Sequence, residues 1–477
     1  MQNKHYFFRV VAIAGLLLTI IFSSCKKDDY YTKEDASLVF SQSLITFDTV
    51  FTTIGTITKK FTVYNPHKNT IKTNIALVGG STSSFSVNVD GVSGTSFTDV
   101  EIPAKDSIFI FVKANINPNN SNGPILHVDE LSFFTNGNRQ KVELLACAED
   151  AKFIIADRQV GSIQYKIVAG ENKTVTWYKD TAYVIYGYAV IDSTAKLIIE
   201  AGTQIYIHKG GGLWVYVDGC LEVNGTKDEP VVFQGDRRSS APKYDYAQWD
   251  RIWINEGSRD NKINYAIIKN AYIGIQAEIW HQDMGNKLIL SNSIIKCSEG
   301  IGFLARSYHV EAYNNVISDC GNYCLALTQG GNYSFINNTF YNQYAYSRST
   351  SAVFFSDYYD PGGDNEIIVG DFNCNFINNI VYGNSTKEFT YAHKYPKITT
   401  FSTQIENCLI RTETKYLSGL TYSDCILNEN PLVNNIKEYD FSLQNDSPCK
   451  GKGKSTSVTE DITGISRNNP PSIGAYE

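Results

Sequence analysis

Apolar residues in the second half of the chain fall in short runs rich in Val, Ile, Phe and Tyr, and Gly, Asn, Asp or Ser separates most of these runs. Runs of this composition predict β-strands joined by turns. The spacing of an amphipathic helix, which extends over about eleven residues or more, is nearly absent beyond the N-terminus. The pattern therefore predicts an all-β chain.

Five of these runs begin after an asparagine in the same short phrase, at Asn292, Asn314, Asn337, Asn378 and Asn407. The intervals between them are 22, 23, 41 and 29 residues. A period in the low twenties, with two longer steps, is typical of a solenoid whose coils bury an apolar face against their neighbours.

Equivalent residues of successive coils in a parallel β-helix lie about 4.8 Å apart. A column of asparagines at one turn can therefore hydrogen-bond the amides of neighbouring coils. The alternative is that asparagine only tolerates the left-handed backbone of turns. Recurrence in one register favours the ladder.

Strand-like runs also precede the asparagine repeats. The region from about Tyr183 to Asn270 resembles right-handed parallel β-helix proteins of the pectate-lyase-like superfamily, in the phrases Glu200–Thr203, Leu221–Thr226, Pro230–Gly235 and Trp249–Trp253. This resemblance implies the architecture but no particular activity, because the fold hosts lyases, hydrolases and adhesins.

The end of the chain is similar to the closing segment of the same class of envelope proteins, in Ser447-Pro448, Asp461–Gly464, Arg467 and Ile473–Glu477. One departure is that Cys449-Lys450-Gly451 stands where an acidic residue often follows Ser-Pro in this class. The departure puts a role for a C-terminal acidic cluster in doubt.

Residues 38 to 148 differ from the asparagine repeats in their sequence pattern, because strand-like runs and turns alternate there about every ten residues. A stretch of this kind predicts an immunoglobulin-like β-sandwich, although the Cys-Trp-Cys spacing of antibody domains is absent. Asn65-Pro66, Ile102–Lys105 and Thr135–Gly137 resemble the abnormal-spindle and hydin type of such modules. We expect a spacer that also covers the first coil; a ligand-binding module is the alternative.

The N-terminus predicts an export signal. Lys4 and Arg9 precede the apolar run Val10–Phe22, which is too short to span a bilayer well. Phe22–Cys25 resembles a bacterial lipobox, in which Cys25 is lipidated and anchors the protein to a membrane. Lys26–Asp29 resembles a surface-export tag, so we expect an outer-membrane lipoprotein, on the cell surface rather than the periplasmic face.

The predicted organisation is a signal peptide at 1–24, a tether at 25–37, an immunoglobulin-like sandwich at 38–148, a linker and β-helix cap at 149–182, a right-handed parallel β-helix at 183–450 and a closing segment at 451–477. The net charge of -7 argues against nucleic acid as a partner. We expect a monomer. Nine cysteines remain after Cys25, and their place in strand phrases favours buried free thiols over a disulfide such as Cys297 to Cys320.

Candidate chemistry centres on two residues of adjacent coils, Glu278 and Arg306. Strand alternation places Ile275, Phe303 and Cys324, together with Ala277, Ala305 and Ala326, on the inner face. Glu278 and Arg306 then point outward beside each other, either in a polar groove or as a surface ion pair worth at most about 1 kcal/mol.

Aromatic and acidic residues surround that pair in sequence and suit sugar binding. The expected substrate-binding residues are Glu278, Trp280, Asp283, Tyr308, Tyr358 and Tyr359. A polysaccharide lyase would use a base and a cation, for which Arg306, His309 and His281 are the candidates. A glycoside hydrolase would use two carboxylates, available in Asp283, Asp357, Asp360 and Glu278.

No cofactor is expected. Calcium is the alternative, through Asp357, Asp360 and Asp364, but their spacing matches no calcium-binding repeat and solvated loop acids are favoured. The preferred function is a noncatalytic envelope lipoprotein that presents a β-helix to glycans or other surface partners. The alternative is a polysaccharide lyase or glycoside hydrolase that acts on an acidic glycan.

Overall fold

The structure is a computed structural model that describes residues 30–51, 58–116, 125–149, 151–236, 246–279, 287–344, 346–363 and 365–477. The predicted signal peptide, Cys25, Trp280, His281, Asp283 and Asp364 lie outside the described residues. The chain divides into two compact units, Met1–Asp150 and Ala151–Glu477. In the part of the chain that is described, no helix has the length and apolar character that crossing a membrane requires.

The N-terminal unit is built from two five-stranded sheets around one hydrophobic core. One sheet has the order β1-β3-β8-β5-β6, with β1 Val39–Phe40, β3 Lys59–Tyr64, β8 Ser107–Ala114, β5 Phe85–Val89 and β6 Val92–Gly94. The other has the order β2-β10-β9-β4-β7, with β2 Leu44–Phe51, β10 Asn138–Glu149, β9 Ile125–Thr135, β4 Ile71–Leu77 and β7 Ser96–Ile102. All pairs are antiparallel except β2 with β10.

Buried Asn65 connects two turns of this unit. Its side-chain amide donates to the carbonyl oxygens of Ile102 at 2.9 Å and Pro103 at 3.1 Å, and its Oδ1 accepts from the amide of His67 at 2.9 Å. The Asn-Pro and Ile-Pro phrases noted in the sequence are therefore hydrogen-bonded to each other.

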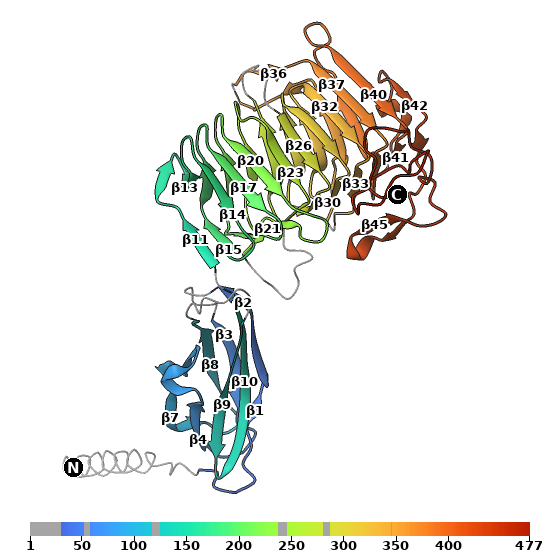
Figure 1. The fold of residues 1–477 in the computed structure, drawn as a ribbon. Helices are drawn as coiled ribbons and strands as arrows, with labels where there is room; N and C mark the ends of the chain where they lie inside the picture. Colours follow the sequence, from blue (N-terminus) through green and yellow to red (C-terminus); the bar gives the residue numbers. More distant parts are fainter. Residues whose placement is uncertain are drawn as a thin grey trace, which may run out of the picture. The chain divides into compact units, whose positions relative to one another are not determined.

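The C-terminal unit is a parallel β-helix of three long sheets (Figure 1), which confirms the all-β prediction. Sheet A contains β11 Ala151–Ile155, β15 Ala182–Tyr186, β18 Gln204–Ile207, β21 Val231–Gly235, β24 Ala266–Lys269, β27 Ile294–Ser298, β30 Val316–Cys320, β33 Thr339–Asn342, β38 Ile380–Gly383, β41 Leu409–Ile410 and β43 Ile426–Leu427.

Sheet B contains β12 Arg158–Val160, β13 Ile163–Ala169, β16 Tyr188–Ile191, β19 Gly212–Val215, β22 Ile252–Ile254, β25 Ile273–Glu278, β28 Ile301–Arg306, β31 Tyr323–Thr328, β34 Val353–Ser356 and β39 Phe389–Ala392. Sheet C contains β14 Thr174–Trp177, β17 Lys196–Glu200, β20 Cys220–Asn224, β23 Asn261–Asn264, β26 Lys287–Ser291, β29 His309–Tyr313, β32 Gly331–Ile336, β37 Phe372–Ile377, β40 Phe401–Glu406 and β42 Tyr422–Ser423.

Alternating burial along these strands fills the interior. In β20, for example, Leu221 and Val223 are buried, whereas the residues between and beside them are half-buried. Parallel pairing begins at β11, which pairs with β15 from Ala151 onward. The first coil therefore lies inside the segment predicted as linker and cap.

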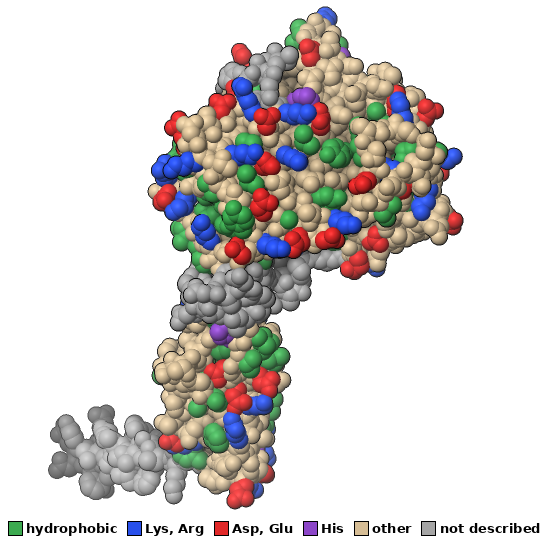
Figure 2. Space-filling view, viewed as in Figure 1, with side chains coloured by type: hydrophobic (Ala, Val, Ile, Leu, Met, Phe, Trp, Pro, Cys, Tyr) green, Lys and Arg blue, Asp and Glu red, His purple; other side chains and the backbone are tan. Residues whose placement is uncertain are grey.

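Sheet C carries a mixed-charge outer face, visible as interspersed blue and red side chains over the β-helix in Figure 2. Its ion pairs include Lys196 with Glu222 and Lys287 with Glu311, whose Nζ and Oε1 atoms lie 2.7 Å apart. Such a face is typical of a solvated surface. The two clefts described below lie at another corner of the unit, where sheet A turns into sheet B.

The five asparagines identified in the sequence lie where sheet C turns into sheet A, which we call the asparagine corner. All five have φ between 49° and 56°, the left-handed region. The side-chain amide of Asn314 donates to Asn292 Oδ1 at 3.1 Å, and that of Asn378 donates to Asn337 Oδ1 at 3.2 Å. Left-handed turns and side-chain stacking therefore coexist in this column.

The bonds to neighbouring backbone amides come from the next residue along the chain. Oδ1 of Asn315, Asn338 and Asn379 accepts from the amide of Ser293 at 3.0 Å, Asn315 at 3.0 Å and Asn338 at 2.8 Å, respectively. Cys408 Sγ ends this buried ladder by accepting from the amide of Asn379 at 3.3 Å. The buried amides of these turns are satisfied without water.

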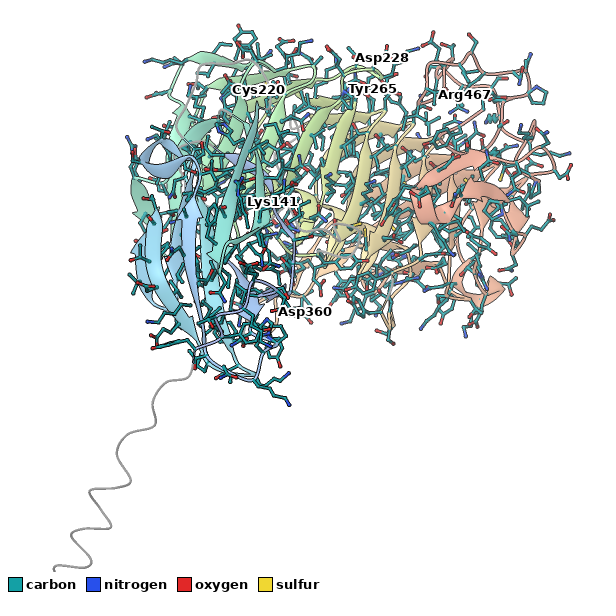
Figure 3. All side chains as sticks on the ribbon, turned by 90° about the horizontal axis from the view of Figure 1, so that it is seen from below. Lys141, Cys220, Asp228, Tyr265, Asp360 and Arg467 are labelled. Atoms are coloured by element: carbon teal, nitrogen blue, oxygen red, sulfur yellow. The ribbon has the colours of Figure 1, made fainter. Side chains whose placement is uncertain are left out.

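The C-terminal segment, residues 428–477, covers the asparagine corner. Figure 3 shows Arg467 along the same edge of the β-helix as Tyr265 and Asp228. The segment contains β44 Val433–Asn435 and β45 Asp440–Leu443. Buried Arg467 donates to Asn314 Oδ1 at 2.7 Å and to the Gly474 carbonyl at 3.0 Å, and its Nη1 lies 3.5 Å from Glu477 Oε2. The segment that resembles a closing element thus binds the repeat itself.

The predicted alignment of one strand in sheet B is wrong by one residue. Phe303 pairs with Leu325 and Ala305 with Leu327, so Leu325 and Leu327 occupy the core while Ala326 faces outward against Ile273 and Leu304. Cys324 is buried as expected. A one-residue slip reverses the faces of a strand, and alanine is small enough to occupy either face.

Candidate functional site

Glu278 and Arg306 form a buried ion pair, which corrects the expectation of a surface pair. They are register partners in β25 and β28, with 2.8 Å between Arg306 Nη1 and Glu278 Oε2, and Glu278 is 1% exposed. Glu278 also accepts hydrogen bonds from Trp253 Nε1 at 2.6 Å and Gln276 Nε2 at 2.8 Å. With these partners and this burial, the pair supports the fold and is poorly placed to contact a polymer.

The insertion between β33 and β37 covers this pair. It contains the hairpin of β35 Tyr358–Tyr359 and β36 Ile368–Val369, and the Tyr359 ring lies 3.8 Å from the Arg306 guanidinium carbon. Tyr358 packs 5.9 Å from the Tyr395 ring. Tyr358 and Tyr359, both expected to bind substrate, therefore pack against the protein's own side chains.

The remaining described candidates are dispersed. Tyr308 is 1% exposed, and its hydroxyl donates to the Ser258 carbonyl at 3.0 Å, so the expectation that it contacts substrate is wrong. His309 is exposed in sheet C, 3.9 Å from Glu311 Oε1, on a different sheet from Arg306. The predicted lyase set is not brought together among the described residues.

The acidic insertion residues also have separate roles. Asp357 is buried and accepts hydrogen bonds from the amides of Lys394 and Tyr395, both at 2.9 Å, and from Thr399 Oγ1 at 2.8 Å. Asp360 is exposed and accepts from the amide of Gly362 at 2.9 Å. Within the described residues no three His, Cys, Asp or Glu side chains gather as a metal site would require.

A polar network instead crosses the outer face of sheet B toward a cleft. Tyr188 donates to Asp250, whose Oδ1 lies 2.8 Å from Nη2 and 2.9 Å from Nε of Arg251. Arg251 donates in turn to Gln276, which bonds to Glu278. The buried ion pair thus supports Arg251 from one side, and Asp250 supports it from the other.

The cleft, which we call the arginine cleft, has a volume of about 670 Å³ and lies where sheet A turns into sheet B. Its functional lining consists of Tyr186, Tyr188, His208, Lys209, Asp250, Arg251 and Trp253. Turns of four successive coils meet there. The first follows β11, the second joins β15 to β16, His208 and Lys209 follow β18, and Asp250 and Arg251 precede β22. The sequence places these groups more than forty residues apart, and coil stacking unites them.

Glycines allow the turns to pack this closely. A Cβ on Gly187, whose φ is +88°, would lie 2.7 Å from the Gln164 carbonyl oxygen. A Cβ on Gly212 would lie 2.6 Å from the Tyr188 ring and 2.5 Å from the Arg251 carbonyl oxygen. Gly212 therefore makes room for both Tyr188 and Arg251.

His208 and Asp236 form a dyad at the cleft. His208 Nδ1 lies 2.7 Å from Asp236 Oδ2, and the imidazole stacks on Tyr186 with 4.5 Å between ring centroids. A carboxylate oxygen only accepts hydrogen bonds, so Nδ1 carries the proton and Nε2 of the neutral ring is a lone-pair base. The His208 side chain is 44% exposed, which leaves it accessible to a ligand.

Tyr188 remains protonated beside this dyad. Burial, followed by the adjacent Asp250 carboxylate, raises the pKa of Tyr188 far above its ordinary value of 10.0. Aromatic rings continue from the cleft along sheet B, where Trp214 stacks on Trp253 with centroids 5.0 Å apart at 16°. Such rings suit contact with sugar faces.

Few features of the sequence indicate this site. Trp249–Trp253 resembles β-helix proteins without indicating a site, and His208 lies between a short strand-like run and the three glycines Gly210–Gly212. His208 and Asp236 follow the paired strands β18 and β21 at an interval of 28 residues, which differs from the repeat in the low twenties. The available signal was the concentration of Asp, Arg and Trp at one turn.

Comparison with known proteins gives one family match, to the pectate-lyase-like β-helix domain, over residues 169–262. No curated protein matches the chain. Among solved structures, the catalytic unit of a GH87 α-1,3-glucanase from Streptomyces thermodiastaticus covers 77% of this chain and 83% of its own, at 11% identity and a TM-score of 0.30.

A family 123 glycoside hydrolase from Clostridium perfringens covers 30% of each chain, at 6% identity and a TM-score of 0.19. These two structural likenesses are too low to bear on activity. The matched family segment contains most of the arginine cleft, from Tyr186 to Trp253, and so this part of the chain is similar to a pectate-lyase-like β-helix domain.

Proposed function

We propose that the β-helix is a polysaccharide-active enzyme that binds an acidic glycan in the arginine cleft and cleaves it by β-elimination. The observation that carries this proposal is the His208–Asp236 dyad in a cleft that also contains Arg251 and Lys209. A base next to cationic groups is the arrangement that proton removal beside a uronate carboxylate requires.

In the proposed reaction, Arg251 and Lys209 bind the uronate carboxylate and stabilise the negative charge that develops on it. His208 Nε2 takes the proton from the carbon beside the carboxylate. The electron pair of that C–H bond forms a carbon–carbon double bond as the neighbouring glycosidic C–O bond breaks. The leaving oxygen is protonated by solvent, and Asp236 stabilises the imidazolium formed on His208.

The same geometry argues against hydrolysis at this cleft. Asp250 already accepts hydrogen bonds from Tyr188 and Arg251, and Asp236 accepts from His208. Carboxylates held in this way position their neighbours, whereas a hydrolase needs one carboxyl group that donates a proton. The dyad also favours an enzyme over the noncatalytic presenter that the sequence suggested.

The test is incubation of purified protein with alginate, polygalacturonate, hyaluronan and chondroitin. We expect unsaturated products, detected by ultraviolet absorbance and mass spectrometry, from at least one of these polymers, and loss of most activity in Arg251→Ala. New reducing ends without unsaturation would identify a hydrolase instead. Absence of any cleavage across the panel would contradict the proposal.

We further propose that the protein is lipidated on Cys25 and displayed at the outer membrane, with the N-terminal unit as an immunoglobulin-like spacer of the abnormal-spindle and hydin type. The two five-stranded sheets and the bonds of Asn65 support the module type. Metabolic labelling with a palmitate analogue should label the wild type and not Cys25→Ser. Protease treatment of intact cells then tests surface display.

A further inference from the structure

A second cleft lies farther along the same corner of the β-helix. Its volume is about 710 Å³, and we call it the tyrosine cleft because Tyr246, Tyr272, Tyr344 and Tyr346 line it together with Glu299 and Asn322. Tyr272 is 46% exposed and Tyr346 is 61% exposed. Neither the buried ion pair nor the proposed reaction uses these residues.

Three of the four tyrosines, Tyr246, Tyr344 and Tyr346, form one connected aromatic surface. The Tyr344 ring centroid lies 4.9 Å from that of Tyr246 and 5.5 Å from that of Tyr346. The Tyr344 hydroxyl donates a hydrogen bond to Glu299 Oε2 at 3.2 Å. Burial, and then the Glu299 carboxylate, raises the pKa of Tyr344 to about 12, so its hydroxyl stays protonated.

A buried ion pair holds this surface in place. Arg348, two residues after Tyr346, donates through Nη2 to both oxygens of Glu388, at 2.6 Å and 2.8 Å. Glu388 also accepts from the Ala352 amide at 2.9 Å, and it is fully buried. Arg348 is thereby anchored two residues after Tyr346, and a tyrosine held near its bound position lowers the entropy cost of binding.

The two clefts share an axis. Tyr272 precedes β25 and Tyr346 precedes β34, while Arg251 precedes β22; β22 and β34 are four steps apart in the order β22-β25-β28-β31-β34. At about 4.8 Å per coil, Arg251 and Tyr346 are separated along the axis by roughly 19 Å, whereas Tyr272 lies on the coil next to Arg251, and its amide donates to the Asp250 carbonyl at 3.1 Å. One extended polysaccharide can reach both.

Their charges differ. The lining of the arginine cleft contains the cations Lys209 and Arg251, with Asp250 paired to Arg251, whereas the charged residue in the described lining of the tyrosine cleft is the exposed Glu299. A carboxylate repels a uronate, while aromatic faces and the Asn322 amide suit the apolar faces and hydroxyls of an uncharged sugar.

We propose that the tyrosine cleft is a second glycan-binding site that takes an uncharged sugar of the same chain, so that the ligand is a mixed polysaccharide of uronate and uncharged residues. The uronate half of this inference rests on the proposed function. The tyrosine cleft adds length-dependent affinity, because its second contact is intramolecular once the first is made.

The test compares binding of mixed polymers, hyaluronan and chondroitin, with all-uronate polymers, alginate and polygalacturonate, by calorimetry. We expect Tyr346→Ala to bind long mixed chains about three- to tenfold more weakly and their disaccharides unchanged. Tyr422→Ala, an exposed tyrosine of sheet C, is the matched control and should bind as the wild type does. Glu299→Gln should strengthen binding of all-uronate chains about fivefold at low salt.

Two results would overturn the inference: wild-type affinity of Tyr346→Ala for long mixed chains, or a wild type that binds only all-uronate chains. In the second case cleavage of those chains would leave the proposed function standing. Binding of mixed chains that depends on Tyr346, without any cleavage, would support the tyrosine cleft and contradict the enzymatic function.

Discussion

Removal of Arg306 should destabilise the β-helix without abolishing activity. Its guanidinium neutralises Glu278, which is 1% exposed, and lies against the Tyr359 ring. Arg306→Met would leave a buried carboxylate without its cationic partner, a change that costs about 3–5 kcal/mol. For a unit of this size we convert this to a fall in melting temperature of about 4–7 °C.

The double variant Glu278→Leu/Arg306→Met separates pair formation from simple loss of packing. Removing both charges eliminates the unpaired carboxylate, so we expect it to regain most of the lost stability. The assay is scanning calorimetry of the full chain at fixed scan rate, with polysaccharide cleavage measured well below the transition. An Arg306→Met variant that melts with the wild type, or a double variant less stable than the single one, would refute the reasoning.

Three further predictions concern the ladder, the cleft and the C-terminal segment. Asn338→Ala removes a buried side-chain amide that bonds to Asn315 and Asn379, and it should lower the unfolding free energy by about 2–4 kcal/mol. Asn292 is half-buried, so Asn292→Ala should lower it by about 1 kcal/mol. Equal losses for the two variants in urea unfolding would contradict the buried ladder. Gly212→Ala should lower kcat/KM at least tenfold, because the added Cβ displaces Arg251. Gly170→Ala should keep wild-type activity, because the atom nearest to its added Cβ lies 4.0 Å away. Equal activity of the two variants would show that this description of the cleft is wrong. Arg467→Ala removes the hydrogen bonds from Arg467 to Asn314 and Gly474, so limited proteolysis should cut the C-terminal segment of this variant faster than that of the wild type. Mass spectrometry identifies the fragments, and an unchanged digestion pattern would contradict the anchoring role of Arg467.

The fold could be predicted from the chain because each coil repeats one local rule. The phrase at Asn314 and Asn337 combines a left-handed turn with a run of mostly buried residues, and stacking follows from repetition. The register of neighbouring strands could be predicted less accurately than the fold. Ala326 matched Ala305 by identity, but the pairing of Ile301 with Tyr323 shifts the strand by one residue.

The site could not be predicted in the same way. Glu278 and Arg306 were correctly placed beside each other, yet their burial depends on Trp253 and Tyr359, which come from another coil and from an insertion. His208 and Asp236 follow the register partners Ile207 and Gly235 of β18 and β21, at an interval of 28 residues that departs from the period in the low twenties. The repeat spacing along the chain therefore does not predict these side-chain contacts.

A matched pair of histidine variants tests the central claim most directly. His208 belongs to the dyad in the arginine cleft, whereas His309 is exposed on sheet C. On a polysaccharide that the wild type cleaves to unsaturated products, we predict that His208→Ala lowers kcat by about 10²-fold or more and that His309→Ala leaves it unchanged. Wild-type kcat in His208→Ala, with both proteins folded, would contradict the account.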